Sequence, residues 1–156
     1  MGTIFGFLYG LLKSIFGNDL NEYLKGSYGS GGDDSVTYFG IGLLTFILAA
    51  AFSFLYYKFA PVSKSKCGAW VVWGLITAAI AGLVAYFWVK GDLDAGRMIQ
   101  VTDDGTSNLP INVSNCIFFG VSNVIVSCVF YVLISFVWRL LAKHRVISHN
   151  AANVPF

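Results

Sequence analysis

Three long segments of the chain contain no charged residue and consist mainly of apolar side chains. They cover residues 36–57, 67–89 and 116–138, so that each holds at least 22 residues. A helix of that length is about 33 Å long, which is enough to cross a hydrocarbon core of about 30 Å. Because backbone polar groups in lipid must be satisfied within their own segment, we predict three membrane-spanning helices.

The composition agrees with an environment of lipid. Hydrophobic residues make up 56% of the chain and charged residues 12%, whereas about a quarter of a soluble domain is charged. So few polar side chains cannot cover the surface of a small water-soluble fold. The net charge of +2 and the lack of a basic stripe disfavour nucleic acid as a partner. We predict an all-α integral membrane protein whose first partner is membrane lipid.

Basic residues predict the orientation of the spans. One group lies between the first and second spans and another follows the third: Lys58, Lys64, Lys66, Arg139, Lys143 and Arg145. The positive-inside rule places both groups in the cytoplasm, and the same residues would contact anionic lipid headgroups. We therefore expect a multi-pass protein of the plasma or inner membrane, with its N-terminus outside and its C-terminus cytoplasmic.

The first 35 residues differ from the spans. Apolar residues recur there at helical spacing, at Ile4, Leu8, Leu11, Leu12 and Ile15. The uninterrupted apolar run is too short to cross a bilayer, so we predict an amphipathic helix in the outer interface that continues toward Leu24. A re-entrant or fourth spanning helix is the alternative. The predicted regions are 1–35 outside, a transmembrane domain over 36–141 with an outer loop over 90–115, and a short basic cytoplasmic tail over 142–156.

Two further patterns concern the ends of the spans. Asp104 and Gly105 favour a small hairpin between 98–101 and 109–113 in the outer loop. Aromatic residues near the span ends suit the headgroup level. They are Tyr56, Tyr57, Trp70, Trp73 and Trp138 at the inner interface, and Tyr38, Tyr86 and Trp88 at the outer one.

Small residues recur along single faces of the N-terminal helix and of the spans. Such stripes allow close approach of helix backbones in lipid. The residues predicted to make helix-packing or oligomer contacts are Gly6, Gly10, Gly42, Ser53, Gly74, Ala78, Gly82 and Gly120. Contacts within one chain and contacts with another chain are both open at this point.

A polar stripe, formed by Asn123, Ser127 and Ser135, follows one face of the third span. These side chains either bond to a neighbouring helix or line a polar pore assembled from several copies. No span holds an Asp, Glu, Lys, Arg or His before its terminal residue, and proton- or ion-coupled carriers need such groups at membrane depth. With no pattern of an active site either, we predict no enzyme, no cofactor and no metal.

The sequence therefore predicts a non-enzymatic membrane subunit that acts by assembling with itself or within a larger membrane complex. The alternative is a homo-oligomeric pore or membrane-disrupting effector, of the holin or host-defence kind. The layout of three spans, with the N-terminus outside and a basic tail inside, resembles that of one class of phage holins. This resemblance covers topology alone and raises the expectation of pore formation.

Overall fold

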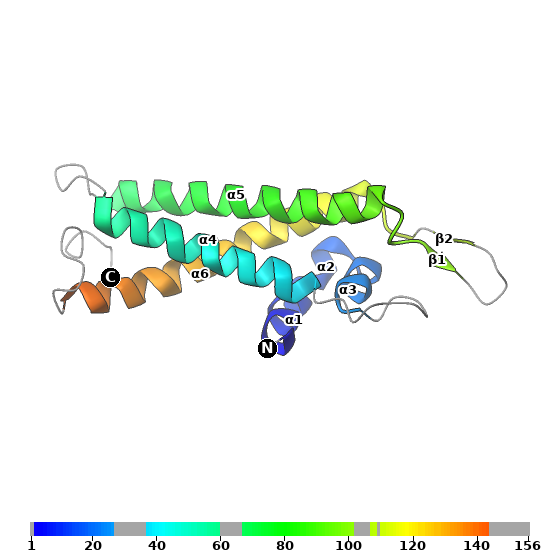
Figure 1. Cartoon of the computed structure of the whole chain (residues 1–156), viewed down its shortest axis with the longest axis horizontal. Helices are drawn as coiled ribbons and strands as arrows, with labels where there is room; N and C mark the ends of the chain where they lie inside the picture. The colour runs from blue at the N-terminus through cyan, green and yellow to red at the C-terminus, as the bar shows by residue number, and fades with distance from the viewer. Residues whose placement is uncertain (1, 27–36, 60–66, 102–106, 109, 144–156) are drawn as a thin grey trace. The chain divides into compact units, whose positions relative to one another are not determined.

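The computed structural model describes residues 2–26, 37–59, 67–101, 107–108 and 110–143, and these are almost entirely helical (Figure 1). The elements are α1 (Gly2–Leu11), α2 (Lys13–Phe16), α3 (Asn18–Leu24), α4 (Thr37–Phe59), α5 (Cys67–Asp94), β1 (Gln100–Val101), β2 (Ser107–Asn108) and α6 (Val113–Lys143). The predicted class, an all-α fold with three transmembrane helices and an N-terminal helix, is confirmed.

Three helices are long and apolar enough to cross a membrane, over Thr37–Lys58, Gly68–Asp94 and Val113–Arg139. Their existence matches the prediction, but α5 and α6 extend beyond the uncharged segments. In α5 the extra turn carries an ion pair between Lys90 and Asp94, whose Nζ and Oδ2 atoms lie 2.6 Å apart. Helices can continue past the hydrocarbon because water satisfies their ends equally well.

Local signals fix both ends of the segment between α5 and α6. After α5, Gly96 adopts φ +73°, and the amide of Arg97 donates to the Asp92 carbonyl, as in a Schellman cap. Before α6, Asn112 and Asn115 each accept from the other's backbone amide at 3.1 Å, a reciprocal capping box. This box places the start of α6 three residues before the predicted Cys116.

The chain divides into two compact units. The first unit comprises 1–43 and 82–123, and the second comprises 44–81 and 124–156. Each long helix contributes one part to each unit, whereas the short helices α1 to α3 belong to the first unit alone. The predicted N-terminal region is thus grouped with parts of α4, α5 and α6.

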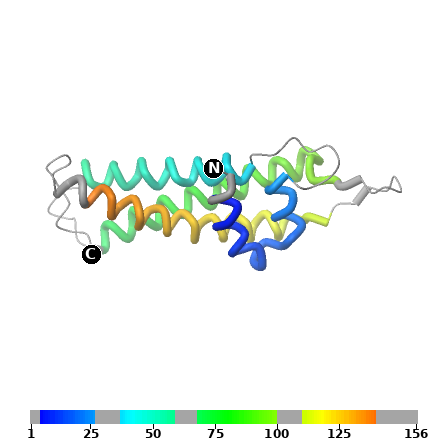
Figure 2. Tube along the Cα trace, turned by 90° about the horizontal axis from the view of Figure 1, so that it is seen from below, coloured from blue at the N-terminus to red at the C-terminus, as the bar shows by residue number. Residues whose placement is uncertain are grey.

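The N-terminal segment is helical as far as Leu24, as predicted, but it is broken at Leu12 and at Gly17. Gly17 has φ +99°, and a Cβ there would lie 2.7 Å from the Asn115 Nδ2 atom. Glycine is the residue that tolerates both conditions. Within the first unit, α1 runs across α4 and α6 instead of beside them (Figures 1 and 2).

The inward face of the N-terminal helices differs from the predicted apolar face. Leu11 is 64% exposed and Ile15 is 39% exposed, and both belong to the apolar stripe of the predicted interfacial helix. The fully buried side chains are instead Tyr9, Phe16, Leu20 and Leu24. An apolar stripe therefore identified the helix but not the side that contacts the rest of the protein.

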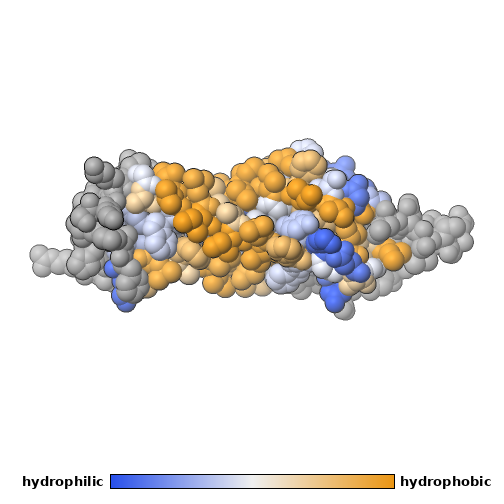
Figure 3. All heavy atoms as spheres, turned by 90° about the horizontal axis from the view of Figure 1, so that it is seen from above, coloured by the Kyte–Doolittle hydropathy of each residue, from blue (hydrophilic) through white to orange (hydrophobic). Residues whose placement is uncertain are grey.

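The outer surface of the long helices is apolar, as Figure 3 shows for one face. Leu75, Leu83 and Leu133 are 59%, 57% and 58% exposed. Exposed apolar side chains on this scale are unfavourable in water and match a surrounding of lipid. The three helices thus have the surface expected of a multi-pass membrane protein.

The predicted hairpin in the loop is present in outline. β1 and β2 pair antiparallel, with Gln100 opposite Asn108, so the second strand precedes the predicted segment 109–113. Asp104 and Gly105 lie outside the described residues, as do most of the glycine- and serine-rich joint and residues 144–156 of the tail.

Candidate functional site

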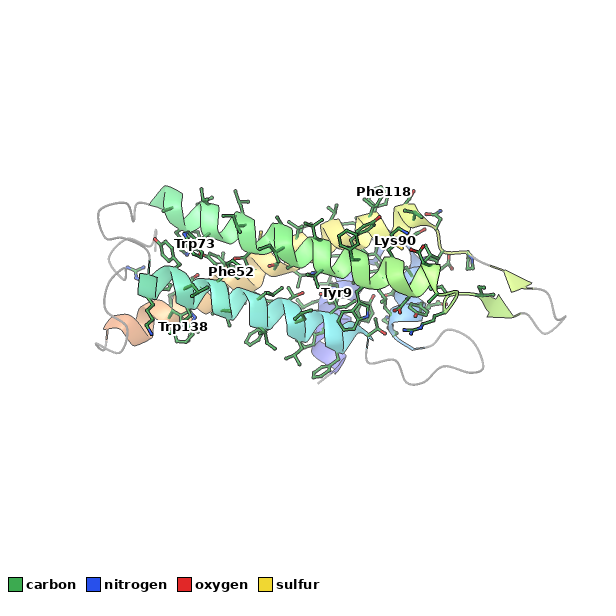
Figure 4. All side chains as sticks on the ribbon, turned by 45° about the horizontal axis from the view of Figure 1, so that its top comes forward. Tyr9, Phe52, Trp73, Lys90, Phe118 and Trp138 are labelled. Atoms are coloured by element: carbon green, nitrogen blue, oxygen red, sulfur yellow. The ribbon has the colours of Figure 1, made fainter. Side chains whose placement is uncertain are left out.

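Buried polar contacts of tyrosine hold the N-terminal helix α1 in the first unit. The Tyr9 side chain is fully buried, and its hydroxyl donates a hydrogen bond to Oδ1 of Asn123 in α6. The Tyr9 ring stacks on Tyr38 with centroids 5.0 Å apart and contacts Phe119 at 5.4 Å. Figure 4 shows the Tyr9 side chain beside the first turns of α4. The N-terminal helix is therefore packed against the long helices and does not rest on lipid alone.

Two asparagines hold the rest of the N-terminal segment. In α3, the buried Asn21 accepts a hydrogen bond of 2.9 Å from the Tyr38 hydroxyl. At the start of α6, the Asn115 amide donates to the carbonyl of Phe16 at 2.7 Å, which satisfies an orphan carbonyl at the end of α2. Neither asparagine stood out in the sequence, because each lies among other turn-forming residues.

A buried carboxylate joins α3 to the end of α5. Asp92 is 8% exposed and accepts hydrogen bonds from Arg97, 2.8 Å away, and from Tyr23. Burial and the negative charge of Asp92 raise the pKa of Tyr23 from 10.0 to about 12. The neutral phenol is therefore the form that stabilises this contact.

This contact predicts a loss of stability at high pH. Because the pKa of Tyr23 is higher in the folded state, its contribution is complete below pH 10 and disappears as the pH rises through about 12. We expect Tyr23→Phe to remove this part of the pH dependence, which unfolding in detergent at stepwise pH would measure. Identical alkaline profiles of the two proteins would contradict the assignment.

Small residues of the first unit allow close contacts. A Cβ on Gly42 would overlap the Phe5 ring of α1, and one on Gly120 would lie 3.1 Å from the carbonyl oxygen of Gly82. The Gly120 position therefore meets backbone, whereas the Gly42 position meets a side chain that can rotate away. Three of the predicted packing residues thus lie at helix contacts within one chain.

A polar network joins the three long helices in the second unit. Its centre is Ser135 of α6, whose Oγ accepts from the Trp70 indole at 3.1 Å and lies 3.4 Å from the Ser53 hydroxyl. The Tyr57 hydroxyl donates to the Ser135 carbonyl at 3.1 Å, and Tyr131 donates to the Trp70 carbonyl at 3.3 Å. These bonds satisfy polar groups that would be costly to bury alone.

Apolar and aromatic side chains surround this network. A Cβ on Gly74 would lie 3.0 Å from the Tyr131 ring, and Ala78 is 1% exposed. Figure 4 shows Phe52 and Trp73 next to each other, with ring centroids 6.2 Å apart. The predicted residues Ser53, Gly74 and Ala78 thus all lie in the interior of the protein.

Three aromatic residues predicted to lie near the inner interface are buried within the protein. Tyr56 and Tyr57 are fully buried and Trp70 is 8% exposed, so these three rings pack against protein, and their headgroup level stays a prediction. Tyrosine and tryptophan combine a large apolar body with one polar group, so an interior with a hydrogen-bond partner suits them as well. A serine at the corresponding depth of another span is the sequence signal that could have indicated these buried hydrogen bonds.

The predicted pore-lining residues are all buried within the single chain. Asn123, Ser127 and Ser135 each have no exposed surface. Asn123 and Ser135 bond to other helices, as described above, whereas the Ser127 hydroxyl has no hydrogen-bond partner among the described residues. In this structure the stripe therefore faces the interior of the protein and not its surface.

Two predicted packing residues, Gly6 and Gly10 of α1, make no close contact. A Cβ placed on either would meet nothing within 4 Å. Glycine in a helix costs about 1 kcal/mol relative to alanine, and among the described residues no atom lies close enough to exclude a Cβ at either position.

The basic residues are only partly described. Lys58 is exposed at the end of α4, with its Nζ atom 5.4 Å from the centre of the Phe54 ring, and Arg139 is half-buried. Lys64, Lys66 and Arg145 lie outside the described residues. Lys143 ends α6.

Comparison with protein families, with curated proteins and with solved structures found no match to this chain. Among the described residues, no group of three His, Cys, Asp or Glu side chains could hold a metal ion. The buried polar contacts and the open glycine flank of α1 are therefore the features from which a function has to be inferred.

Proposed function

We propose that the protein is a non-enzymatic membrane subunit that acts by assembling, with copies of itself or within a larger membrane complex. The observation that carries this proposal is the open space at Gly6 and Gly10. Two glycines one turn apart present bare backbone, which allows a helix of another chain to approach closely in lipid. An unused glycine pair is difficult to explain by the needs of this chain alone.

The hydrogen bonds of the polar side chains in the spans support the same proposal. The most polar side chains of the spans, Asn123 and Ser135, are bonded to helices of the same chain. Intramembrane catalysis and ion transport generally need ionisable or water-facing groups at membrane depth. A chain that uses its polar residues to fix its own helices is better suited to a scaffolding role.

The pore alternative receives no such support. A pore lined by Asn123, Ser127 and Ser135 would require these buried side chains to leave the interior. Separating Asn123 from Tyr9 would remove the acceptor of the buried Tyr9 hydroxyl, at a cost of about 1–3 kcal/mol. We therefore propose assembly without a polar channel along this stripe.

Substitution of the glycine pair tests the proposal. Because Gly6 and Gly10 have open space, Gly6→Leu/Gly10→Leu should fold normally and lose contacts with other chains. Chemical cross-linking in native membranes should yield higher-mass adducts for the natural chain and few for the variant. Gly91→Leu is the matched control, since Gly91 of α5 also has nothing within 4 Å. A natural chain that stays monomeric in membranes and in mild detergent would refute assembly.

We further propose that the N-terminus and the loop between α5 and α6 lie outside and that the C-terminal tail is cytoplasmic. The positions of Lys58 and Arg139 near the ends of their candidate spans support this orientation. An impermeant thiol reagent should modify Asp104→Cys, but not Ala152→Cys, in intact cells whose native cysteines have been replaced. The reverse pattern would invert the proposed topology.

A further inference from the structure

The Phe7 and Leu11 side chains of α1 are the most exposed large apolar residues of the N-terminal segment, at 66% and 64%. They lie on the side opposite Phe5 and Tyr9, since residues two positions apart in a helix differ by about 200°. The outward face of α1 is therefore strongly apolar, and it has no cover within the described chain. The position of α1 along the lengths of α4 and α6 indicates what covers this outward face.

Contacts with two candidate spans fix that position. Tyr9 bonds to Asn123, which is ten residues beyond Val113, the start of the third candidate span, or about 15 Å along α6. Phe5 contacts Gly42, which is five residues beyond Thr37, the start of the first candidate span, or about 8 Å along α4. Half of a hydrocarbon core of about 30 Å is about 15 Å, so both contacts fall within one leaflet.

The direction of α1 completes the placement. It crosses α4 and α6 (Figures 1 and 2), so it runs in the plane of the membrane when those helices span it. Along α1, the outward Phe7 and Leu11 and the inward Phe5 and Tyr9 lie on opposite sides, so one side of the helix contacts protein and the other is left to lipid.

We infer that α1 is an in-plane helix embedded in one leaflet, where lipid acyl chains cover Phe7 and Leu11. The protein thereby favours curved membranes in which that leaflet is on the convex side. The inference rests on the proposed membrane placement but not on assembly. An in-plane helix adds area to the leaflet that holds it. Among the described residues the second unit has no corresponding helix, since it consists of parts of α4, α5 and α6. Acyl chains in a leaflet that is expanded by curvature fill the space beside such a helix more easily.

Sorting between flat and curved membrane tests this inference. The full chain, with its native cysteines replaced, would be reconstituted in giant phosphatidylcholine vesicles from which narrow tubes are pulled outward. An impermeant dye on Asp104→Cys marks molecules that have α1 in the outer leaflet. The same dye on Ala152→Cys marks molecules of the opposite orientation, because three spans separate α1 from the tail.

The two labelled populations should sort in opposite directions. We expect a tube-to-vesicle density ratio above unity for the Asp104→Cys label and below unity for the Ala152→Cys label. Phe7→Gln/Leu11→Gln should bring both ratios toward unity. Leu55→Gln/Phe136→Gln should not, although it places the same two substitutions at exposed positions of the second unit. Equal partition of the two populations of the natural chain would overturn the inference.

A depth measurement provides a second readout. A spin label on Leu11→Cys should collide with oxygen, which concentrates in hydrocarbon, and be protected from a water-soluble nickel chelate. Greater access for the nickel chelate would also overturn the inference. A protein that cross-links into assemblies but fails both tests would leave the proposed subunit role intact and remove only the effect on curvature.

Discussion

Replacement of Gly120 by leucine is expected to separate α6 from α5 in the first unit. A Cβ on Gly120 would lie 3.1 Å from the Gly82 carbonyl oxygen and 3.1 Å from the Cβ of Tyr86. Backbone atoms of a packed helix cannot rotate away, so the helices themselves have to move. Overpacking of a core costs about 1–3 kcal/mol. A substitution that meets backbone atoms should lie at the upper end of this range.

Unfolding by sodium dodecyl sulfate in mild detergent, followed by circular dichroism, would measure this loss for Gly120→Leu. Gly91→Leu is the control, because it introduces the same side chain into α5 where nothing lies within 4 Å. We expect its stability to stay close to that of the natural chain. Equal destabilisation by both substitutions would show that the close α5–α6 contact is not what makes Gly120 necessary.

Replacement of Asn123 by leucine is expected to release the N-terminal helices from the long ones. The Tyr9 hydroxyl would lose its acceptor inside an apolar, fully buried site. An unsatisfied buried donor costs about 1–3 kcal/mol, and the bulk of leucine beside the stacked Tyr9 and Tyr38 rings adds to that cost. The result should be a lower unfolding midpoint and faster proteolysis near α1.

A double-mutant cycle with Tyr9→Phe separates the hydrogen bond from the change in packing. If the bond is the main term, the two substitutions together should cost clearly less than the sum of the single effects. Ser122→Ala is the control in the same helix, since Ser122 is buried but its hydroxyl bonds to the carbonyl of Phe118 in α6 itself. Strict additivity would mean that Tyr9 and Asn123 contribute independently.

Much of this fold could be predicted because membrane insertion leaves a simple trace in the sequence. Uncharged runs of sufficient length located all three spans, and small residues such as Gly74 and Gly120 located positions where side chains of other helices come close. The ends of the helices were harder to predict from the sequence. They depend on local caps, such as the Asn112–Asn115 pair and Gly96, which lie outside the apolar pattern.

The pairing of polar groups could not be predicted, because it depends on which helix faces lie together. Asn123 was recognisable as a buried hydrogen-bonding residue, but its partner Tyr9 lies 114 residues away. Trp70 was predicted to lie at the inner interface from its position near a span end, and that position did not indicate that its indole bonds to Ser135. An apolar stripe likewise cannot indicate the inward side of a helix that has protein on one side and lipid on the other.

The attachment of α1 to α6 has a consequence for the order of events during synthesis. At about 5–20 residues per second, a ribosome adds Asn123 roughly 6–23 s after Tyr9, given their separation of 114 residues. For much of that interval the apolar N-terminal segment is outside the ribosome, while the part of α6 to which it docks has not yet been synthesised. Nascent chains halted before the third span should therefore be bound by chaperones or degraded, whereas chains that have completed it should become protected as α1 docks.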